Sequence, residues 1–244
     1  ATDWVTLISY PIMFIPPMLY ARRRSKAASI FNNGLALDSN NFGHLGGLKM
    51  ALIVSGMTIA TSFAAEPIAA LLPDMPEWFE EIMSGLTGGS FVLSFISVSI
   101  FAPLFEEWLC RGVVLRGLIT KLRPASAIAV SAAFFAVLHM NPWQALPAFL
   151  LGLIFGYVYY KTGSLKLTML MHFVNNTMAL VMSRIPSLQD AETFADVMSP
   201  WAYACVIAAC IIFLAAAFLT VRAIPMSSEN APCNCDEVPS ISAE

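Results

Sequence analysis

Long apolar segments separated by short polar ones make up most of this chain. A bilayer core about 30 Å thick is spanned by roughly 20 apolar helical residues, or by somewhat fewer where the membrane thins. Segments that reach or approach that length are residues 4–20, 48–72, 91–105, 106–122, 126–140, 143–160, 165–181 and 201–221. A backbone that faces lipid needs internal hydrogen bonds. We therefore predict an all-α fold, a polytopic membrane helix bundle with seven or eight helices.

The composition supports a membrane protein. Of the residues, 58% are hydrophobic and 12% are charged, whereas soluble domains have about 45–50% and about 25%. The 13 basic and 16 acidic side chains are too few to coat a soluble protein of 244 residues, so membrane lipid is an expected partner. The net charge of −3 gives no indication of a nucleic-acid partner, and we expect none.

Basic and acidic residues occupy largely different connecting segments, and Arg184 is the one basic residue among the acidic ones. The basic ones are Arg22, Arg23, Arg24, Lys26, Lys49, Arg116, Lys121, Arg123, Lys161, Lys166 and Arg222, and the acidic ones are Glu66, Asp74, Glu77, Glu80, Glu81, Asp190, Glu192 and Asp196. Because basic segments stay in the cytoplasm, we expect the N-terminus outside and the C-terminus inside. That orientation needs an odd number of crossings, which favours seven, with residues 91–122 as one long or broken helix. We expect an integral protein of the bacterial cytoplasmic membrane.

Charged residues interrupt one apolar segment. Ionisable groups inside membrane spans are costly and commonly functional. Glu107 and Arg111 are four residues apart and share a helical face. We predict a salt bridge between them, which leaves Glu106 unpaired and free to act as a base. A buried ion network that only joins helices explains the same residues equally well.

Two histidines, His139 and His172, also lie in apolar segments, and Asn176 shares a helical face with His172. Each histidine alone is typical of a hydrogen-bonded packing residue. The basic turn at residues 122–123 is 16 or 17 residues from both Glu106 and His139. A helical hairpin bent there places both at one level, roughly 24 Å along each arm. We expect the four polar side chains to converge.

Such a set could hydrolyse an amide bond inside the membrane. A carboxylate in an apolar pocket is a better base, and a neighbouring imidazole can hold the same water, so Glu106 and His139 would activate water. His172 and Asn176 could then donate hydrogen bonds to the oxyanion. Alternatively, Glu106, His139 and His172 could bind zinc.

These residues resemble the motifs of the CPBP family of intramembrane proteases, which contains CAAX-prenyl endopeptidases and bacterial bacteriocin-processing and self-immunity proteins. The family pattern E-E-x-x-x-R, F-x-x-x-H and H-x-x-x-N is matched by Glu106-Glu107-x-x-x-Arg111, Phe135-x-x-x-His139 and His172-x-x-x-Asn176. The resemblance implies that Glu106 and His139 activate water, that His172 and Asn176 form the oxyanion site, and that Glu107, Arg111 and Phe135 support them.

The resemblance further implies a glutamate-type protease, historically called a metalloprotease, with no cofactor favoured and zinc possible. The expected substrate is a membrane-associated protein or peptide. We divide the chain into N-terminal transmembrane helices and loops (1–89), a protease core (90–182), an external loop with the last helix (183–223) and a disordered cytoplasmic tail (224–244). Other interpretations are a non-catalytic bacteriocin-immunity or membrane interaction protein, a haem carrier using both histidines, and a transporter.

Overall fold

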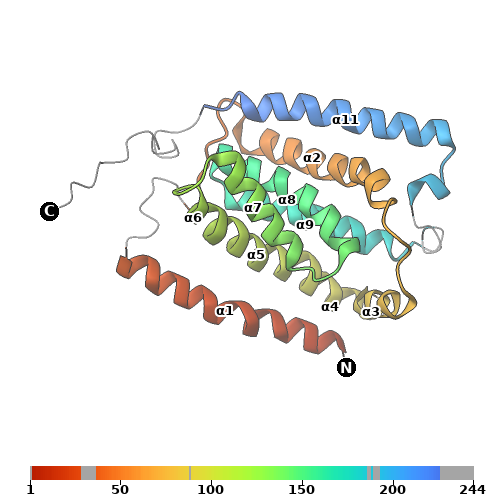
Figure 1. Cartoon of the computed structure of the whole chain (residues 1–244), viewed down its shortest axis with the longest axis horizontal. Coiled ribbons are helices and arrows are strands. Elements are labelled where there is room, and N and C mark those ends of the chain that lie inside the picture. The colour runs from red at the N-terminus through yellow and green to blue at the C-terminus, as the bar shows by residue number, and fades with distance from the viewer. Residues whose placement is uncertain (1, 29–36, 88, 186–187, 189–192, 226–244) are drawn as a thin grey trace.

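The computed structural model describes residues 2–28, 37–87, 89–185, 188 and 193–225. Every regular element in this part of the chain is a helix, which confirms the all-α prediction. The helices lie roughly side by side, with α1 (Thr2–Ala28) along one edge and α11 (Pro200–Arg222) along the other (Figure 1). Of the predicted disordered tail (224–244), residues 226–244 lie outside the described residues, whereas Ile224 is buried in the core.

Within the described residues, four helical stretches are long and apolar enough to cross a membrane: Gly46–Ala69, Phe91–Leu118, Pro142–Thr162 and Pro200–Arg222. The first is α2, the third is α8 and the last is α11. Two shorter apolar stretches, Leu7–Ala21 in α1 and Pro124–Val137, which is α7, accompany them. These stretches agree with the predicted integral membrane protein.

Residues 91–118 form one continuous helical run, so residues 106–118 continue the preceding helix, which is the arrangement expected for seven crossings. The run consists of α4 (Phe91–Ser94), η1 (Phe95–Phe101), α5 (Ala102–Glu107), η2 (Trp108–Leu115) and α6 (Arg116–Leu118). Both η segments are π-helical, with backbone hydrogen bonds from i to i+5. Short π segments inside α-helices are frequent at functional sites. Here they flank α5, which carries Glu106 and Glu107.

The turns that position the other motifs follow from local sequence. Pro124 occupies the first turn of α7, where its missing N–H has no cost, so the chain reverses at residues 119–123 as predicted. The side chain of Asn141 accepts a hydrogen bond from the Gln144 N–H and caps α8. Gly163 has a φ of +64° and ends α8. Ser164 then caps α9 (Leu165–Met182).

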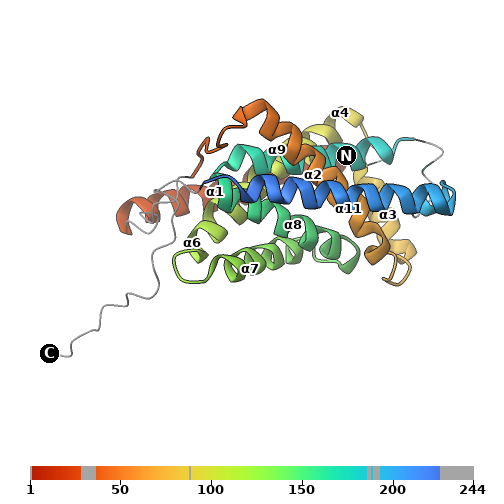
Figure 2. The ribbon, with the colours of Figure 1, turned by 90° about the horizontal axis from the view of Figure 1, so that it is seen from above.

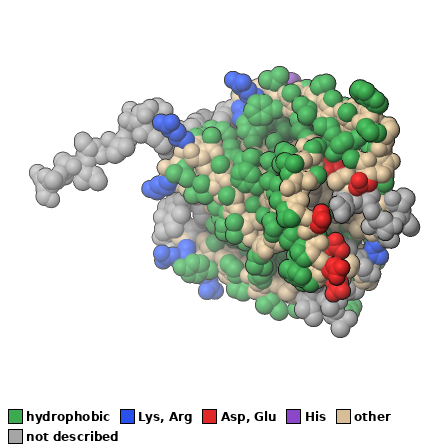
Figure 3. Space-filling view, turned by 45° about the vertical axis from the view of Figure 1, so that its right-hand side comes forward, with side chains coloured by type: hydrophobic (Ala, Val, Ile, Leu, Met, Phe, Trp, Pro, Cys, Tyr) green, Lys and Arg blue, Asp and Glu red, His purple; other side chains and the backbone are tan. Residues whose placement is uncertain are grey.

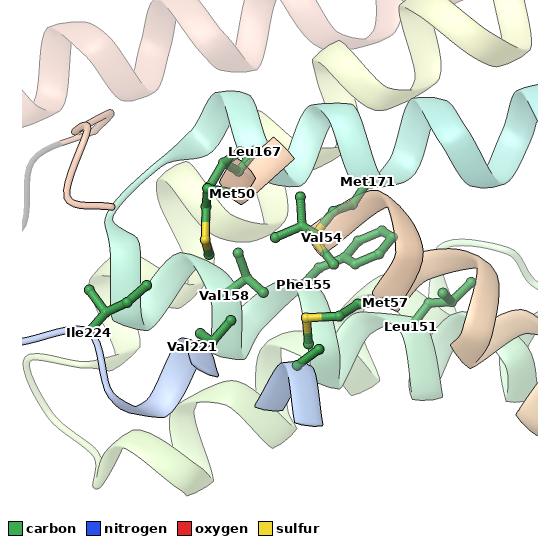
Figure 4. Packing of buried hydrophobic residues seen from close by; sticks show 11 residues of the cluster. Met50, Val54, Met57, Leu151, Phe155, Val158, Leu167, Met171, Val221 and Ile224 are labelled. Atoms are coloured by element: carbon green, nitrogen blue, oxygen red, sulfur yellow. The ribbon is translucent and has the colours of Figure 1, made fainter. Parts of the chain in front are cut away.

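The hydrophobic core lies between α2, α8, α9 and the end of α11 (Figure 4). Its buried members include Met50, Val54 and Met57 of α2, Phe155 and Val158 of α8, Met171 of α9 and Val221 of α11. Ile224, just after α11, is also buried in it. Seen from above, α11 crosses over this layer (Figure 2). The core therefore holds α9, with two motif residues, against helices outside the motifs.

Two short helices of the described part were not predicted, the 3-10 helix η3 (Phe194–Asp196) and α3 (Glu77–Thr87). α3 lies in the acidic segment between α2 and α4. Its Phe79 is buried, and the centroid of its ring lies 5.4 Å from that of the Trp143 ring. Trp78 and Ile82 are exposed. Figure 3 shows acidic side chains gathered at one end of the visible face and most basic ones at the other. The charge segregation in the sequence is thus a segregation in space on this face.

Candidate active site

The Glu107 carboxylate lies at the centre of a buried polar cluster. Its Oε1 accepts hydrogen bonds from Arg111 Nη1 at 2.8 Å and from His172 Nδ1 at 3.1 Å. Glu107 and Arg111 are both fully buried, and His172 is 3% exposed. The predicted Glu107–Arg111 salt bridge is confirmed. The contact with His172, 65 residues away, joins the first and third motifs directly.

The Arg111 guanidinium is held by more than its carboxylate. Nη2 donates to the carbonyl oxygen of Gly152 in α8 at 3.0 Å. The guanidinium carbon lies 4.7 Å from the ring centroid of Phe135 and 5.3 Å from that of Phe155. A planar cation between two aromatic rings gains cation–π attraction and packing. Arg111 therefore links the run 91–118 to α7 and α8.

Phe135 brings the second motif into the cluster. Its ring lies edge-on to His139 at 5.1 Å and to His172 at 5.4 Å, between centroids, and it also contacts Arg111. His139 follows the end of α7, and its Nδ1 lies 3.0 Å from the Phe135 carbonyl oxygen. Because a carbonyl only accepts, Nδ1 is the donor and carries a proton, so Nε2 is the acceptor in the neutral tautomer.

Glu106 has a partner, contrary to the prediction that it is unpaired. The Tyr10 hydroxyl of α1 donates to Glu106 Oε1 at 3.1 Å. The Tyr10 ring stacks with Phe14, and Phe14 stacks with Phe105, next to Glu106. Sequence reasoning missed Tyr10 because it lies in an apolar segment far from the motifs, where only its hydroxyl hints at a polar contact. One carboxylate oxygen of Glu106 remains for other partners.

Asn176 also has fixed partners. Its Nδ2 donates to the backbone carbonyl of Val98 in η1 at 2.8 Å, and its Oδ1 accepts from Asn175 Nδ2 at 3.1 Å. A similar contact supports η2, where the Ser131 hydroxyl of α7 donates to the Cys110 carbonyl at 2.8 Å. Each π segment is thus joined to a neighbouring helix through one of its carbonyl groups.

The predicted site residues are brought together in part. Glu107, Arg111, Phe135, His139 and His172 form one contact network, whereas within the described residues no hydrogen bond joins Glu106 to His139 or His172 to Asn176. Nor do three His, Cys, Asp or Glu side chains of the described part form a group that could hold a metal ion. The alternative zinc set of Glu106, His139 and His172 is therefore not assembled.

Comparison with known proteins gives one match. Residues 88–178 match the family model described as Rce1-like, type II CAAX prenyl endopeptidase Rce1-like. The matched segment runs from the start of α4 nearly to the end of α9 and contains all three motifs. It confirms the predicted family resemblance and supports a membrane protease. Searches of curated proteins and of solved structures found no match.

Proposed function

We propose that this chain, through the segment that matches the CAAX endopeptidase family, is an intramembrane endopeptidase that cleaves a membrane-associated protein or peptide with water activated by Glu106 and His139. The observation that carries the proposal is the contact network of the three motifs: Glu107 bonds to both Arg111 and His172, and Phe135 touches both histidines. A non-catalytic immunity protein needs no such contact of two imidazoles with a buried ion pair and a shared aromatic ring.

The hydrogen-bonding states of the side chains suit water activation. With its Nδ1–H donating to the Phe135 carbonyl, the neutral tautomer of His139 presents Nε2 as an acceptor. Glu106 keeps one carboxylate oxygen beyond the Tyr10 hydroxyl, and its side chain is partly exposed. A water molecule has two hydrogens, so it can donate one to each acceptor and direct its lone pair at a carbonyl carbon. Glu106 then acts as the general base.

The proposed reaction balances without a cofactor. As the water oxygen bonds to the peptide carbonyl carbon, its proton passes to Glu106 and the carbonyl oxygen becomes an oxyanion. When the C–N bond breaks, Glu106 returns the proton to the leaving nitrogen, and a carboxylic acid and an amine result. Asn176 offers the N–H that does not bind Val98. His172 Nε2 donates as well when the ring is an imidazolium, because Glu107 engages its Nδ1–H.

Comparison of protein termini tests this function without a known substrate. Cells expressing the wild-type chain or Glu106→Gln at equal abundance are compared by mass spectrometry of membrane and secreted proteins. Glu81→Gln, which changes an exposed carboxylate of α3, is the matched control. We expect new termini in the wild type and in Glu81→Gln that are absent in Glu106→Gln. Identical termini in all three samples would support the non-catalytic alternative.

A further inference from the structure

A chain of side-chain hydrogen bonds crosses from α2 through α9 to η1. Ser62 Oγ of α2 donates to Asn175 Oδ1 at 3.0 Å, Asn175 Nδ2 donates to Asn176 Oδ1 at 3.1 Å, and Asn176 Nδ2 donates to the Val98 carbonyl at 2.8 Å. All three side chains are partly buried. Ser62 lies outside the segment that matches the protease family.

The Val98 carbonyl fixes the direction of the whole chain. A carbonyl only accepts, so the Asn176 amide must turn its NH₂ toward Val98 and its oxygen toward Asn175. Asn175 must then turn its NH₂ toward Asn176 and its oxygen toward Ser62. If either amide were flipped, two acceptors or two donors would face each other. The single hydroxyl proton of Ser62, which also lies near its own helix carbonyl at Thr58, completes the chain when it points to Asn175.

We propose that Asn175 and Ser62 are positioning residues that hold the Asn176 amide in one orientation, with one N–H on Val98 and the other directed away from it. The inference rests on the proposed function, in which that second N–H serves the oxyanion. Neither Asn175 nor Ser62 needs to touch the substrate. Their effect is that the donor is oriented before the substrate arrives, which is how preorganised donors stabilise a transition state.

Asn175→Asp is the decisive variant because it keeps the shape of the side chain and replaces the NH₂ donor that faces Asn176 by an acceptor oxygen. A carboxylate at 175 accepts from Ser62 but also presents an acceptor to Asn176. The Asn176 amide then turns its NH₂ toward residue 175 and loses the bond to Val98. Ser62→Thr keeps the hydroxyl, whereas Ser62→Ala removes it. Asn41→Asp is the matched control, because Asn41 donates to the Lys161 and Pro225 carbonyls and takes no part in the hydrogen bonds that join Ser62 to Val98.

The first measurement does not depend on activity. The full chain, labelled with ¹⁵N-asparagine in detergent micelles, gives side-chain NH₂ signals, of which that of Asn176 is assigned by its loss in Asn176→Ala. We expect slow hydrogen exchange of this NH₂ group in the wild type, Ser62→Thr and Asn41→Asp, and at least tenfold faster exchange in Asn175→Asp and Ser62→Ala. Equal exchange in all variants would overturn the positioning chain.

The second measurement is the rate at which Glu106-dependent termini form in native membranes. We expect Asn176→Ala and Asn175→Asp to lower this rate by about 10²-fold at equal abundance, Ser62→Ala to lower it severalfold, and Ser62→Thr to retain it. If Asn176→Ala cleaves at the wild-type rate while hydrogen exchange changes as predicted, the oxyanion role of Asn176 is wrong, but Asn175 and Ser62 still orient its amide. If Asn176→Ala is slow but Asn175→Asp is normal, the positioning inference fails alone.

Discussion

Arg111 is the largest of the fully buried side chains, and its charge is matched by one carboxylate and one carbonyl. Arg111→Met keeps an apolar stem of similar length but leaves the Glu107 carboxylate buried without its arginine partner, with only the hydrogen bond to His172 remaining. Removing one member of a buried ion pair typically costs about 3–5 kcal/mol. We expect a loss of that size in the free energy of unfolding, measured by denaturant unfolding in detergent.

The double variant Glu107→Leu/Arg111→Met distinguishes two causes of the lost stability, the uncompensated Glu107 charge and the lost packing of the Arg111 side chain. Replacement of a whole buried pair by apolar residues is often close to neutral. We therefore expect the double variant to be more stable than Arg111→Met alone. A double variant no more stable than Arg111→Met would mean that the loss comes from Arg111 packing on Phe135 and Phe155 rather than from the uncompensated carboxylate.

Tyr10 is expected to hold the Glu106 carboxylate in place. Tyr10→Phe removes the hydroxyl that donates to Oε1 but retains the ring that stacks on Phe14. Hydrogen bonds to charged groups contribute about 1.5–3 kcal/mol, so a carboxylate freed of this bond samples other rotamers. We expect cleavage about tenfold slower, measured as the rate of Glu106-dependent terminus formation at equal abundance. Faster cleavage would instead mean that the hydroxyl obstructs Glu106.

At the scale of elements, α7 and α8 pack closely because Gly152 has no side chain. A Cβ there would lie 3.1 Å from both the Cα and the Cβ of Ala132, and helix backbone cannot move aside. The same glycine provides the carbonyl that Arg111 binds. We expect Gly152→Ala to lower the thermal unfolding temperature, because overpacking typically costs about 1–3 kcal/mol, more than the helix-propensity gain of about 1 kcal/mol.

Gly56→Ala is the control for that prediction. A Cβ at Gly56 would lie 2.6 Å from the Phe213 ring, nominally a closer contact. However, Phe213 is 41% exposed and its side chain can rotate away from α2. We expect Gly56→Ala to leave the unfolding temperature nearly unchanged or to raise it. Equal losses in both variants would indicate that glycine acts through helix flexibility rather than through close packing.

The sequence predicted the helices but not their inner geometry. Apolar length was sufficient to place α7 and α8, which were predicted at 126–140 and 143–160 and lie at Pro124–Val137 and Pro142–Thr162. The π segments were missed because apolar residues recur almost alike in α- and π-turns. α3 was missed because its 11 residues are too short for a span and lie among acidic residues.

At the scale of the whole molecule, the site was predictable only where its contacts are local. Glu107 and Arg111 pair within one helical turn, so their spacing was sufficient. Tyr10 and Ser62 reach the site from α1 and α2, and their partners are 96 and 113 residues away. No spacing rule connects residues so distant, since the packing of α1 and α2 on the protease segment decides which hydroxyl meets which motif residue.

The positions of α1 and α11 bear on the predicted orientation of the bundle in the membrane. α1 begins at one end of the bundle and α11 finishes at the other (Figure 1), as an odd number of crossings requires. The acidic helix α3 lies near the start of α1, and the basic turn after α6 lies at the opposite end. If basic segments remain in the cytoplasm, α3 faces outside.

Cysteine labelling tests that orientation. Single cysteines replace Glu81 of α3 or Lys121 of the turn after α6, both exposed, in a chain whose other cysteines are alanine. A membrane-impermeant maleimide should label Glu81→Cys in intact cells and Lys121→Cys only after permeabilisation. The reverse pattern would invert the topology while keeping the fold. Labelling of both cysteines in intact cells would contradict the prediction that residues 81 and 121 lie on opposite sides of the membrane, because residues at opposite ends of a spanning bundle cannot share one aqueous compartment.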